Sequence, residues 1–213
     1  MLTRNKWQGT VQKFEAEWWG DCANTYGEET KQIAYAKVMG LDPGPWKGGD
    51  HWPVWDFAVK DVLDVGGGPS SMLLKSKFAS AGVIDPCDYP DWVEARYETH
   101  GVRFERRPAE DALSEYGNHS VDLALCYNVL QHTMDPEKIC REMRRVAKTV
   151  RIFEWVDLAP HPGHPHELHA EELTEWLGGN GTTRHAWLDE SYQEIGPESD
   201  SPVRQHGWGG WFE

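Results

Sequence analysis

A glycine-rich turn flanked by acidic residues is the part of the sequence whose residue types and spacing suit the binding of a nucleotide. Gly66, Gly67 and Gly68 directly follow a β-branched run, and Asp64 stands at the end of that run. Glycines let a backbone turn sharply and approach a ligand without a Cβ in the way. Asp85 ends the next short apolar run, and its carboxylate has two oxygens for the hydroxyls of a ribose. The sequence therefore predicts a ribose-containing cofactor at this turn.

The turn fits two kinds of cofactor. Gly66 and Gly68 match the first two glycines of the dinucleotide pattern GxGxxG, but Ser71 stands in the place of the third. A dinucleotide pyrophosphate prefers a neutral turn, whereas the carboxylate of Asp64 at the strand tip suits the cationic amino group of a methionine moiety. These residues favour a methionine-derived cofactor, and a dinucleotide-dependent oxidoreductase remains the alternative.

Short apolar strands alternate with helical segments around the turn. Strands are expected at residues 60–65, 82–86, 102–105, 121–126 and 149–156, and helices at residues 72–78, 91–99 and from Asp135 onward. This alternation predicts βαβ units, in which helices cover both faces of a parallel sheet. The carboxyl ends of the strands, with the glycine turn among them, then form the ligand-binding edge. The expected fold class is α/β, with a Rossmann-like, doubly wound and mostly parallel sheet.

The two flanks differ in composition from this middle part. Residues 1–59 are rich in Trp and contain two helical stretches, so we expect them to form an N-terminal helical cap. Residues 60–213 are expected to form the cofactor-binding domain. Its tail has strand-like segments at 182–188 and 203–212, which predict a C-terminal antiparallel hairpin.

The order and spacing of the acids and glycines resemble those of the class I S-adenosylmethionine-dependent methyltransferases. Asp64, Gly66 and Gly68 match the first motif of that family, and Asp85 matches its ribose-binding acid. The resemblance covers about residues 60–157. It implies S-adenosyl-L-methionine as the cofactor, S-adenosylhomocysteine as the product and a methyltransferase activity.

Two further segments extend this resemblance. Ala109 and Glu110 follow the third expected strand and resemble the family's adenine-recognising segment, although Pro108 stands where family members often carry an Asp. The partner of the adenine amine therefore stays open between Glu110 and backbone groups. Cys126 and Tyr127 end the fourth strand, where they would lie against the cofactor. The cofactor-binding residues that the resemblance implies are Asp64, Gly66, Gly67, Gly68, Asp85, Pro86, Ala109, Glu110, Cys126 and Tyr127.

Histidines gather in the segments that follow the fourth and fifth expected strands. His132 follows the fourth strand, and His161, His164, His166 and His169 follow the fifth, so all are expected at the cofactor edge of the sheet. A neutral imidazole can accept a proton near neutral pH. We predict His132, His166 and His169 as candidate catalytic bases, with packing or capping as the alternative. The spacing of the loop histidines is too loose to predict a metal site.

The acceptor pocket is expected in the flanks, because a generic nucleotide-binding core needs no Trp. Most of the 12 tryptophans lie before residue 61 or after residue 157. Aromatic walls suit a planar, apolar or cationic acceptor. Trp18, Trp19 and Tyr26 are predicted to cover the cofactor and line the substrate pocket. Packing of thin flanks onto the sheet is the competing interpretation.

The composition narrows the class of partner. The net charge of −14 opposes binding to the phosphates of a nucleic acid, and the four cysteines form no disulfide or zinc pattern. No run approaches the ~18 apolar residues of a membrane span. We therefore expect a cytoplasmic enzyme that methylates O, N or C of a small molecule, with no nucleic acid or membrane partner; the oligomeric state stays open. A methyltransferase of RNA, DNA or protein and a non-catalytic, methyltransferase-like binding subunit are the alternatives.

Overall fold

The computed structural model describes residues 2–25, 27–42 and 55–213. At its centre is an eight-stranded sheet with the strand order β3-β2-β1-β4-β5-β8-β6-β7. The strands are β1 (Trp55–Val65), β2 (Ser76–Ile84), β3 (Val102–Glu105), β4 (Val121–Tyr127), β5 (Ala147–Trp155), β6 (Gly181–Leu188), β7 (Glu194–Ile195) and β8 (Gln205–Phe212). Strands β1 to β5 are parallel, whereas β8 runs antiparallel to both β5 and β6. The predicted α/β class and the C-terminal antiparallel hairpin are therefore confirmed.

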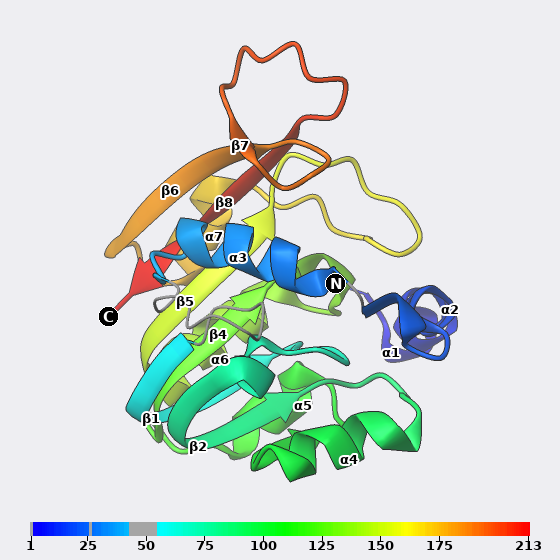
Figure 1. The fold of residues 1–213 in the computed structure, drawn as a ribbon, viewed down its shortest axis with the longest axis vertical. Helices are drawn as coiled ribbons and strands as arrows, with labels where there is room; N and C mark the ends of the chain where they lie inside the picture. Colours follow the sequence, from blue (N-terminus) through cyan, green and yellow to red (C-terminus); the bar gives the residue numbers. More distant parts are fainter. Residues whose placement is uncertain (1, 26, 43–54) are drawn as a thin grey trace, which may run out of the picture.

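Helices cover both faces of the sheet (Figure 1). One face carries α3 (Glu28–Val38) and α4 (Asp91–Thr99), and the other carries α5 (Ala109–Ala112), α6 (Pro136–Val146) and α7 (Ala170–Trp176). Side chains along a strand alternate between the two faces. In β4, Leu125 therefore packs in the core beneath α3, while the neighbouring Cys126 packs in the core beneath α6.

Local sequence signals account for the start of α6. The Asp135 side chain accepts a hydrogen bond from the backbone N–H of Lys138 at 3.0 Å, and Pro136 occupies the first turn. Both features stabilise a helix start, because they satisfy or remove N–H groups that lack a partner in the helix. Ile139 and Met143 lie on the buried side of this helix. The predicted start of this helix is confirmed.

The segment after the glycine turn differs from the prediction. Instead of a helix over residues 72–78, the chain makes a short 3₁₀ turn (Met72–Lys75) and enters β2 at Ser76. The Ser71 hydroxyl caps this turn by accepting from the N–H of Leu73 at 3.0 Å. Beyond it, Ser76 pairs with Trp55 at the start of an extended β1. Strand pairing between distant segments thus prevails over the local helical pattern.

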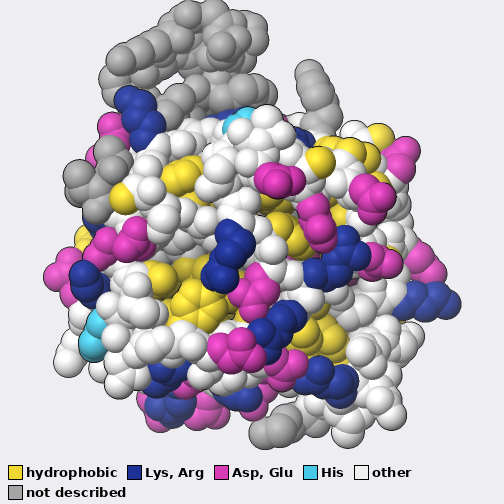
Figure 2. Space-filling model, turned by 90° about the horizontal axis from the view of Figure 1, so that it is seen from below, with side chains coloured by type: hydrophobic (Ala, Val, Ile, Leu, Met, Phe, Trp, Pro, Cys, Tyr) yellow, Lys and Arg dark blue, Asp and Glu magenta, His cyan; other side chains and the backbone are white. Residues whose placement is uncertain are grey.

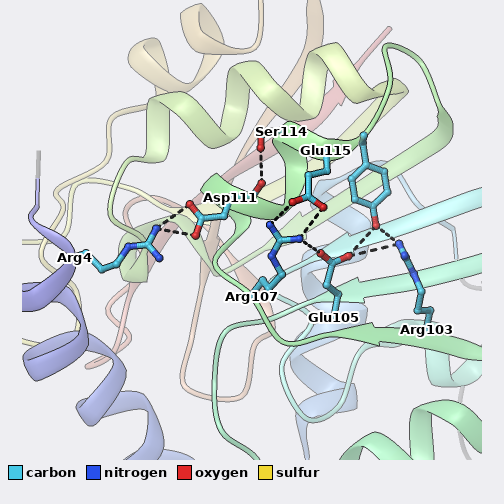
Figure 3. A network of polar contacts seen from close by, with 8 residues as sticks. Arg4, Arg103, Glu105, Arg107, Asp111, Ser114 and Glu115 are labelled. Atoms are coloured by element: carbon cyan, nitrogen blue, oxygen red, sulfur yellow. Dashed lines mark hydrogen bonds and ion pairs between the residues drawn. The ribbon is translucent and has the colours of Figure 1, made fainter.

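The N-terminal segment forms α1 (Arg4–Trp7), a π-helical turn (Gln8–Gln12) and α2 (Lys13–Trp19), which we call the cap. The indole N–H of Trp7 donates to the carbonyl of His132 at 2.7 Å, which ties the cap to the loop after β4. Arg4 donates two hydrogen bonds to Asp111, at 2.8 and 2.7 Å, on the side of α5 (Figure 3). These contacts join the cap to loops at the carboxyl edge of the sheet; the predicted boundary after residue 59 differs from the structure, because β1 already begins at Trp55.

Charged side chains of both signs are intermingled on the face shown in Figure 2. Arg106 pairs with Glu94 at 2.6 Å. Figure 3 shows that Arg107 pairs with Glu115, at 2.7 Å, and with Glu105, at 3.1 Å. The positive charges of Arg106 and Arg107 are therefore offset by neighbouring carboxylates. Among the described helices, none has the length and apolarity needed to cross a bilayer.

Candidate cofactor and acceptor site

A cavity of about 420 Å³ lies at the carboxyl ends of the parallel strands. The glycine turn, the ends of β2 and β5, the cap, α3 and the loop after β5 all contribute to its lining. Its volume falls within the range of small-molecule and cofactor sites, roughly 300–1,000 Å³. We call the part beside the glycine turn the cofactor end and the part beside α3 and the loop after β5 the acceptor end.

The glycine turn forms one wall of the cofactor end. Gly66 and Gly68 line the cavity and have positive φ angles of 77° and 61°, a conformation that side chains disfavour. A Cβ at Gly66 would lie 2.3 Å from the Val129 side chain, and one at Gly67 would lie 2.9 Å from the Asp64 carboxylate. The turn therefore needs glycine both for its backbone shape and for its contact with the loop after β4.

Asp85 lies at the end of β2 and lines the cavity together with Pro86. Its carboxylate accepts hydrogen bonds of 3.0 Å from the N–H of Gly68, the N–H of Cys87 and the hydroxyl of Tyr89. Burial raises the pKa of Asp85, although these three donors act in the opposite direction. A carboxylate has about four acceptor positions. One of them therefore remains for a hydroxyl of a ligand.

Asp64 lies behind the turn rather than on the cavity wall. Its side chain is fully buried, and Oδ2 accepts from the hydroxyl of Tyr127 at 2.6 Å and from the hydroxyl of Ser71. Burial raises the pKa of Asp64 to about 7, against the effect of these two hydrogen bonds. The Tyr127 hydroxyl also accepts from the N–H of Met72 at 3.0 Å. Asp64 and Tyr127 therefore support the turn from beneath.

The segment that the resemblance assigns to adenine recognition lies at the cavity. Ala109 and Glu110 both line the cavity. The Glu110 carboxylate accepts from the N–H of Met134 at 2.8 Å and from the N–H of Asp135 at 3.1 Å. Glu110 thereby joins the segment after β3 to the segment that starts α6.

The two residues predicted at the end of β4 differ in position: Tyr127 lines a smaller pocket beside the glycine turn, whereas Cys126 does not line the cavity. Cys126 points into the core beneath α6, where its Sγ lies 3.9 Å from Glu154, because alternate residues of a strand face opposite sides. Asn128 and Val129 line the cavity instead. Asn128 has a left-handed φ of 59°, and its buried Oδ1 has no hydrogen-bond partner among the described residues. Asn adopts a left-handed φ more readily than most residues. An Asn directly after the fourth strand was therefore a sequence signal for this turn, and the prediction did not use it.

His132 is the predicted catalytic residue that the structure brings to the cavity. Its Nδ1 lies 2.9 Å from Oε1 of Glu15 in the cap and 3.1 Å from the carbonyl oxygen of Gly163. Burial alone would lower the pKa of His132, but the hydrogen bond and the charge of Glu15 raise it above its ordinary value. The sequence contained no signal for this pair, because its members are far apart along the chain.

The other histidines at the cavity are not the predicted ones. His161 and His164 line it, and the His164 ring packs edge-on against His132 with the centroids 4.3 Å apart. Burial, followed by the neighbouring His132 and His161, lowers the pKa of His164 to about 4. His166 instead bonds the carbonyl of Thr133 at 2.8 Å, and His169 bonds the carboxylate of Asp157 at 2.9 Å. Neither of these two lines the cavity.

The described residues contain no group of three or more His, Cys, Asp or Glu side chains that could hold a metal ion.

Aromatic side chains wall the acceptor end. Trp18 and Trp19 of the cap line the cavity, and Trp19 reaches the glycine turn, where a Cβ on Gly68 would lie 3.9 Å from its ring; Tyr26 lies outside the described residues. Tyr35 of α3 and Trp155 of β5 stand edge to face at 5.8 Å and form another part of the wall. The sequence did not single out these two residues, whose contact depends on how α3 crosses the sheet.

The strand order and the site at the carboxyl edge define a nucleotide-binding α/β domain of the Rossmann-like class. Residues 63–150 match the family model described as a methyltransferase domain. An uncharacterized methyltransferase of Mycobacterium tuberculosis is 33% identical over an alignment of 128 residues that covers 56% of this chain and 47% of that protein. The chain thus spans about half the length of the curated relatives it matches.

Solved structures share the fold at low sequence identity. The 1,6-didemethyltoxoflavin-N1-methyltransferase of Burkholderia thailandensis superposes with a TM-score of 0.62 at 15% identity, covering 98% of this chain and 90% of that one. A methyltransferase of Thermotoga maritima, described as a possible histamine N-methyltransferase, superposes with a TM-score of 0.58 at 15% identity, covering 96% and 98%. Residues 63–150 are therefore similar to a methyltransferase domain, and the solved structures show that the chain shares the fold of these S-adenosylmethionine-dependent methyltransferases.

Proposed function

We propose that the protein transfers the methyl group of S-adenosyl-L-methionine to a small-molecule acceptor. The observation that carries this proposal is the continuous cavity, which runs from Asp85 and the glycine turn to the aromatic wall of α3 and β5. Methyl transfer needs alignment of the two reactants and exclusion of water. A cavity shared by a cofactor end and an acceptor end meets both needs.

The residues at the cofactor end suit the chemistry of S-adenosylmethionine. Asp85 would accept from a ribose hydroxyl, and Ala109 and Glu110 would lie beside the adenine. The unpartnered Oδ1 of Asn128 is a free acceptor that fits the ammonium group of the methionine moiety. When bound, the cofactor supplies a methyl group activated by its sulfonium. Oδ1 of Asp64 likewise lacks a partner among the described residues and would suit the same ammonium group, while Oδ2 of Asp64 holds Ser71 and hence the turn.

Several features support a small acceptor over a macromolecule. The acceptor end is walled by the cap, α3 and the loop after β5, and its aromatic lining suits a planar molecule. The net charge of −14 opposes a nucleic acid. The Burkholderia neighbour was solved with 1,6-didemethyltoxoflavin bound, and the name of the Thermotoga neighbour refers to histamine, both of which are small molecules.

Calorimetric titration of the full chain with S-adenosylmethionine, S-adenosylhomocysteine and NAD tests the cofactor part of the proposal. We expect both sulfur compounds to bind at micromolar concentration, and Asp85→Ala to weaken them at least about 30-fold because a buried ribose acceptor is lost. Asp88→Ala is the matched control, since Asp88 is an exposed neighbour of the same loop. Binding of NAD alone, or of no ligand below millimolar concentration, would contradict the proposal.

A further inference from the structure

The pair formed by Glu15 and His132 is buried at the acceptor end of the cavity. Their side chains are only 14% and 16% exposed, although Glu15 comes from the cap and His132 from the loop after β4. Both residues line the cavity. A carboxylate and an imidazole that meet at 2.9 Å inside a ligand cavity form the arrangement that enzymes use to orient a histidine.

The contacts of Nδ1 fix the position of the proton on the His132 ring. Both of its neighbours, the Glu15 carboxylate and the Gly163 carbonyl, are acceptors, so Nδ1 must carry a hydrogen. In the neutral ring, the lone pair then resides on Nε2. His132 is therefore arranged to accept a proton at Nε2 and to share the resulting positive charge with Glu15.

The charged and titratable groups around His132 come from three elements. Glu15 of α2 touches it, Glu154 of β5 lies beneath the same loop, and His164 and His161 approach it from the loop after β5. The two carboxylates favour the protonated ring. The pKa of His164, lowered to about 4, keeps that neighbour neutral near pH 7, so it does not oppose the charge. The surroundings therefore tolerate an imidazolium at His132.

We propose that His132 is the general base of the methyl transfer, that Glu15 is its positioning residue, and that the acceptor carries a proton on the atom that is methylated. This inference rests on the proposed methyltransferase function. The acceptor class is then a hydroxyl compound or a nitrogen compound with an N–H bond, such as a phenol, an azole or an ammonium group. Tertiary amines and thioethers, which need no base, fall outside it.

In the proposed step, the O–H or N–H proton of the acceptor passes to Nε2 of His132, and the electron pair left on the acceptor atom forms the new bond to the methyl carbon. The bond between that carbon and the sulfonium sulfur breaks, and its electron pair stays on sulfur. The proton later leaves Nε2 for solvent, which restores the neutral ring.

NMR of the protein labelled with ¹⁵N-histidine, bound to S-adenosylhomocysteine, tests the pair without a known acceptor. We expect His132 to carry its hydrogen on Nδ1 and its pKa to fall in Glu15→Gln, because a negative charge is lost. Glu17→Gln, an exposed carboxylate of the same helix, should leave that pKa unchanged. His132→Gln assigns the signal. A hydrogen on Nε2 of the neutral ring, or a pKa that ignores Glu15→Gln, would overturn the proposal.

Formation of S-adenosylhomocysteine in the presence of probe acceptors tests the acceptor class. We expect turnover with catechol, imidazole or tyramine but not with trimethylamine or dimethyl sulfide, and a fall in kcat of roughly 100-fold in His132→Gln. In Glu15→Gln the acidic limb of the pH profile should move to lower pH, a change that loss of packing alone would not cause. Turnover of the proton-free probes that survives His132→Gln would overturn the inference.

The two tests remain distinct from the test of the proposed function. If wild-type protein fails to bind S-adenosylhomocysteine, the proposed function itself is wrong. If it binds this compound but the pKa of His132 is independent of Glu15, only the assignment of the base is wrong. Where no probe acceptor turns over, the NMR result decides.

Discussion

The cofactor end and the acceptor end of the cavity draw on different parts of the chain. At the cofactor end, Gly66, Asp85 and Glu110 each follow a strand of the parallel sheet within a residue or a few residues. At the acceptor end, Glu15 comes from the cap and Tyr35 from α3, and both reach the cavity across long stretches of sequence. One end is built by the topology of the sheet, and the other by the packing of the flanks.

This difference separates the features that doubly wound sheets share from the features that are specific to this chain. The carboxyl ends of parallel strands lie at one edge in any doubly wound sheet, so the residues that follow these strands lie close together. The flanks have no such constraint, and the identity of the acceptor is expected to depend on them. We therefore expect changes at the cofactor end to alter cofactor affinity strongly, and changes in the flanks to alter it by about fivefold or less.

The largest effect is expected at Gly66. In Gly66→Ala, a Cβ would meet Val129 at 2.3 Å on a backbone with positive φ, so the turn must shift. We expect the affinity for S-adenosylhomocysteine, measured by calorimetry, to fall about 100-fold, which corresponds to roughly 2.7 kcal/mol.

Gly178→Ala is the matched control for Gly66→Ala. Gly178 also has a positive φ, of 91°, but no atom would contact its added Cβ within 4 Å. We expect a loss of stability of about 1–2 kcal/mol with unchanged affinity. Equal affinities in the two variants would show that the turn does not shape the cofactor end.

Glu154, which accepts hydrogen bonds from the loop after β4, is expected to make the stability of the protein depend on pH. Its Oε1 accepts from the N–H groups of Val129 and Leu130, both at 2.9 Å, and burial raises its pKa to about 7. The folded state therefore holds this proton more tightly than the unfolded state, whose pKa is near 4.5. The contribution of Glu154 to stability is greatest below pH 4.5 and is lost as the pH rises toward 7 and above.

Thermal unfolding of the ligand-free protein between pH 5 and pH 8 measures this contribution. In Glu154→Gln we expect the free energy of unfolding to vary less with pH than in wild type, by on the order of 2 kcal/mol. Glu142→Gln is the control, because Glu142 is paired with Arg145 and its pKa is lowered rather than raised. A wild-type pH dependence in Glu154→Gln would contradict the assignment.

A smaller effect is expected where the cap meets the cofactor end. Arg4 holds the cap to Asp111 through two hydrogen bonds, but both side chains are partly exposed, which weakens such pairs. We expect Arg4→Ala to speed the dissociation of S-adenosylhomocysteine about two- to fivefold in stopped-flow measurements. Lys13→Ala, which removes an exposed pair within the cap, should not change the rate. Identical rates in both variants would show that the cap does not retain the ligand.

The smallest effect is expected at Tyr192, which lies at the acceptor end edge to face with Tyr35. Tyr192→Ala should leave the affinity for S-adenosylhomocysteine within about twofold of wild type, because the side chain lies outside the cofactor end. Calorimetry with the same ligand measures this directly. A tenfold loss of affinity would show that Tyr192 contributes to cofactor binding and would contradict the proposed difference between the two ends of the cavity.

Sequence analysis located the residues whose placement follows from strand ends. Asp85 and Ala109 could be predicted because each follows a recognisable strand, and the start of α6 because Asp135 and Pro136 form a local helix signal. The helix predicted over residues 72–78 was wrong. Its apolar residues satisfy a helical pattern locally, but pairing of β2 with the distant start of β1 decides the structure.

Residues whose placement depends on side-chain direction or distant contacts could not be predicted. Cys126 and Asn128 lie two residues apart and would share one face of a continued strand. The left-handed φ of Asn128 ends the strand geometry, so that Asn128 lines the cavity while Cys126 packs in the core. In the loop after β5, a tight backbone bridge joins His161 to His164 and keeps their rings together. The contact between Glu15 and His132 exists only because the cap folds back over the sheet edge.

A crystal structure of the full chain with S-adenosylhomocysteine tests the central claim most directly. Our account predicts a ribose hydroxyl on Asp85, the adenine beside Ala109 and Glu110, and the sulfur facing the acceptor end near His132. An adenine bound between Tyr35 and Trp155, with the glycine turn left empty, would contradict it.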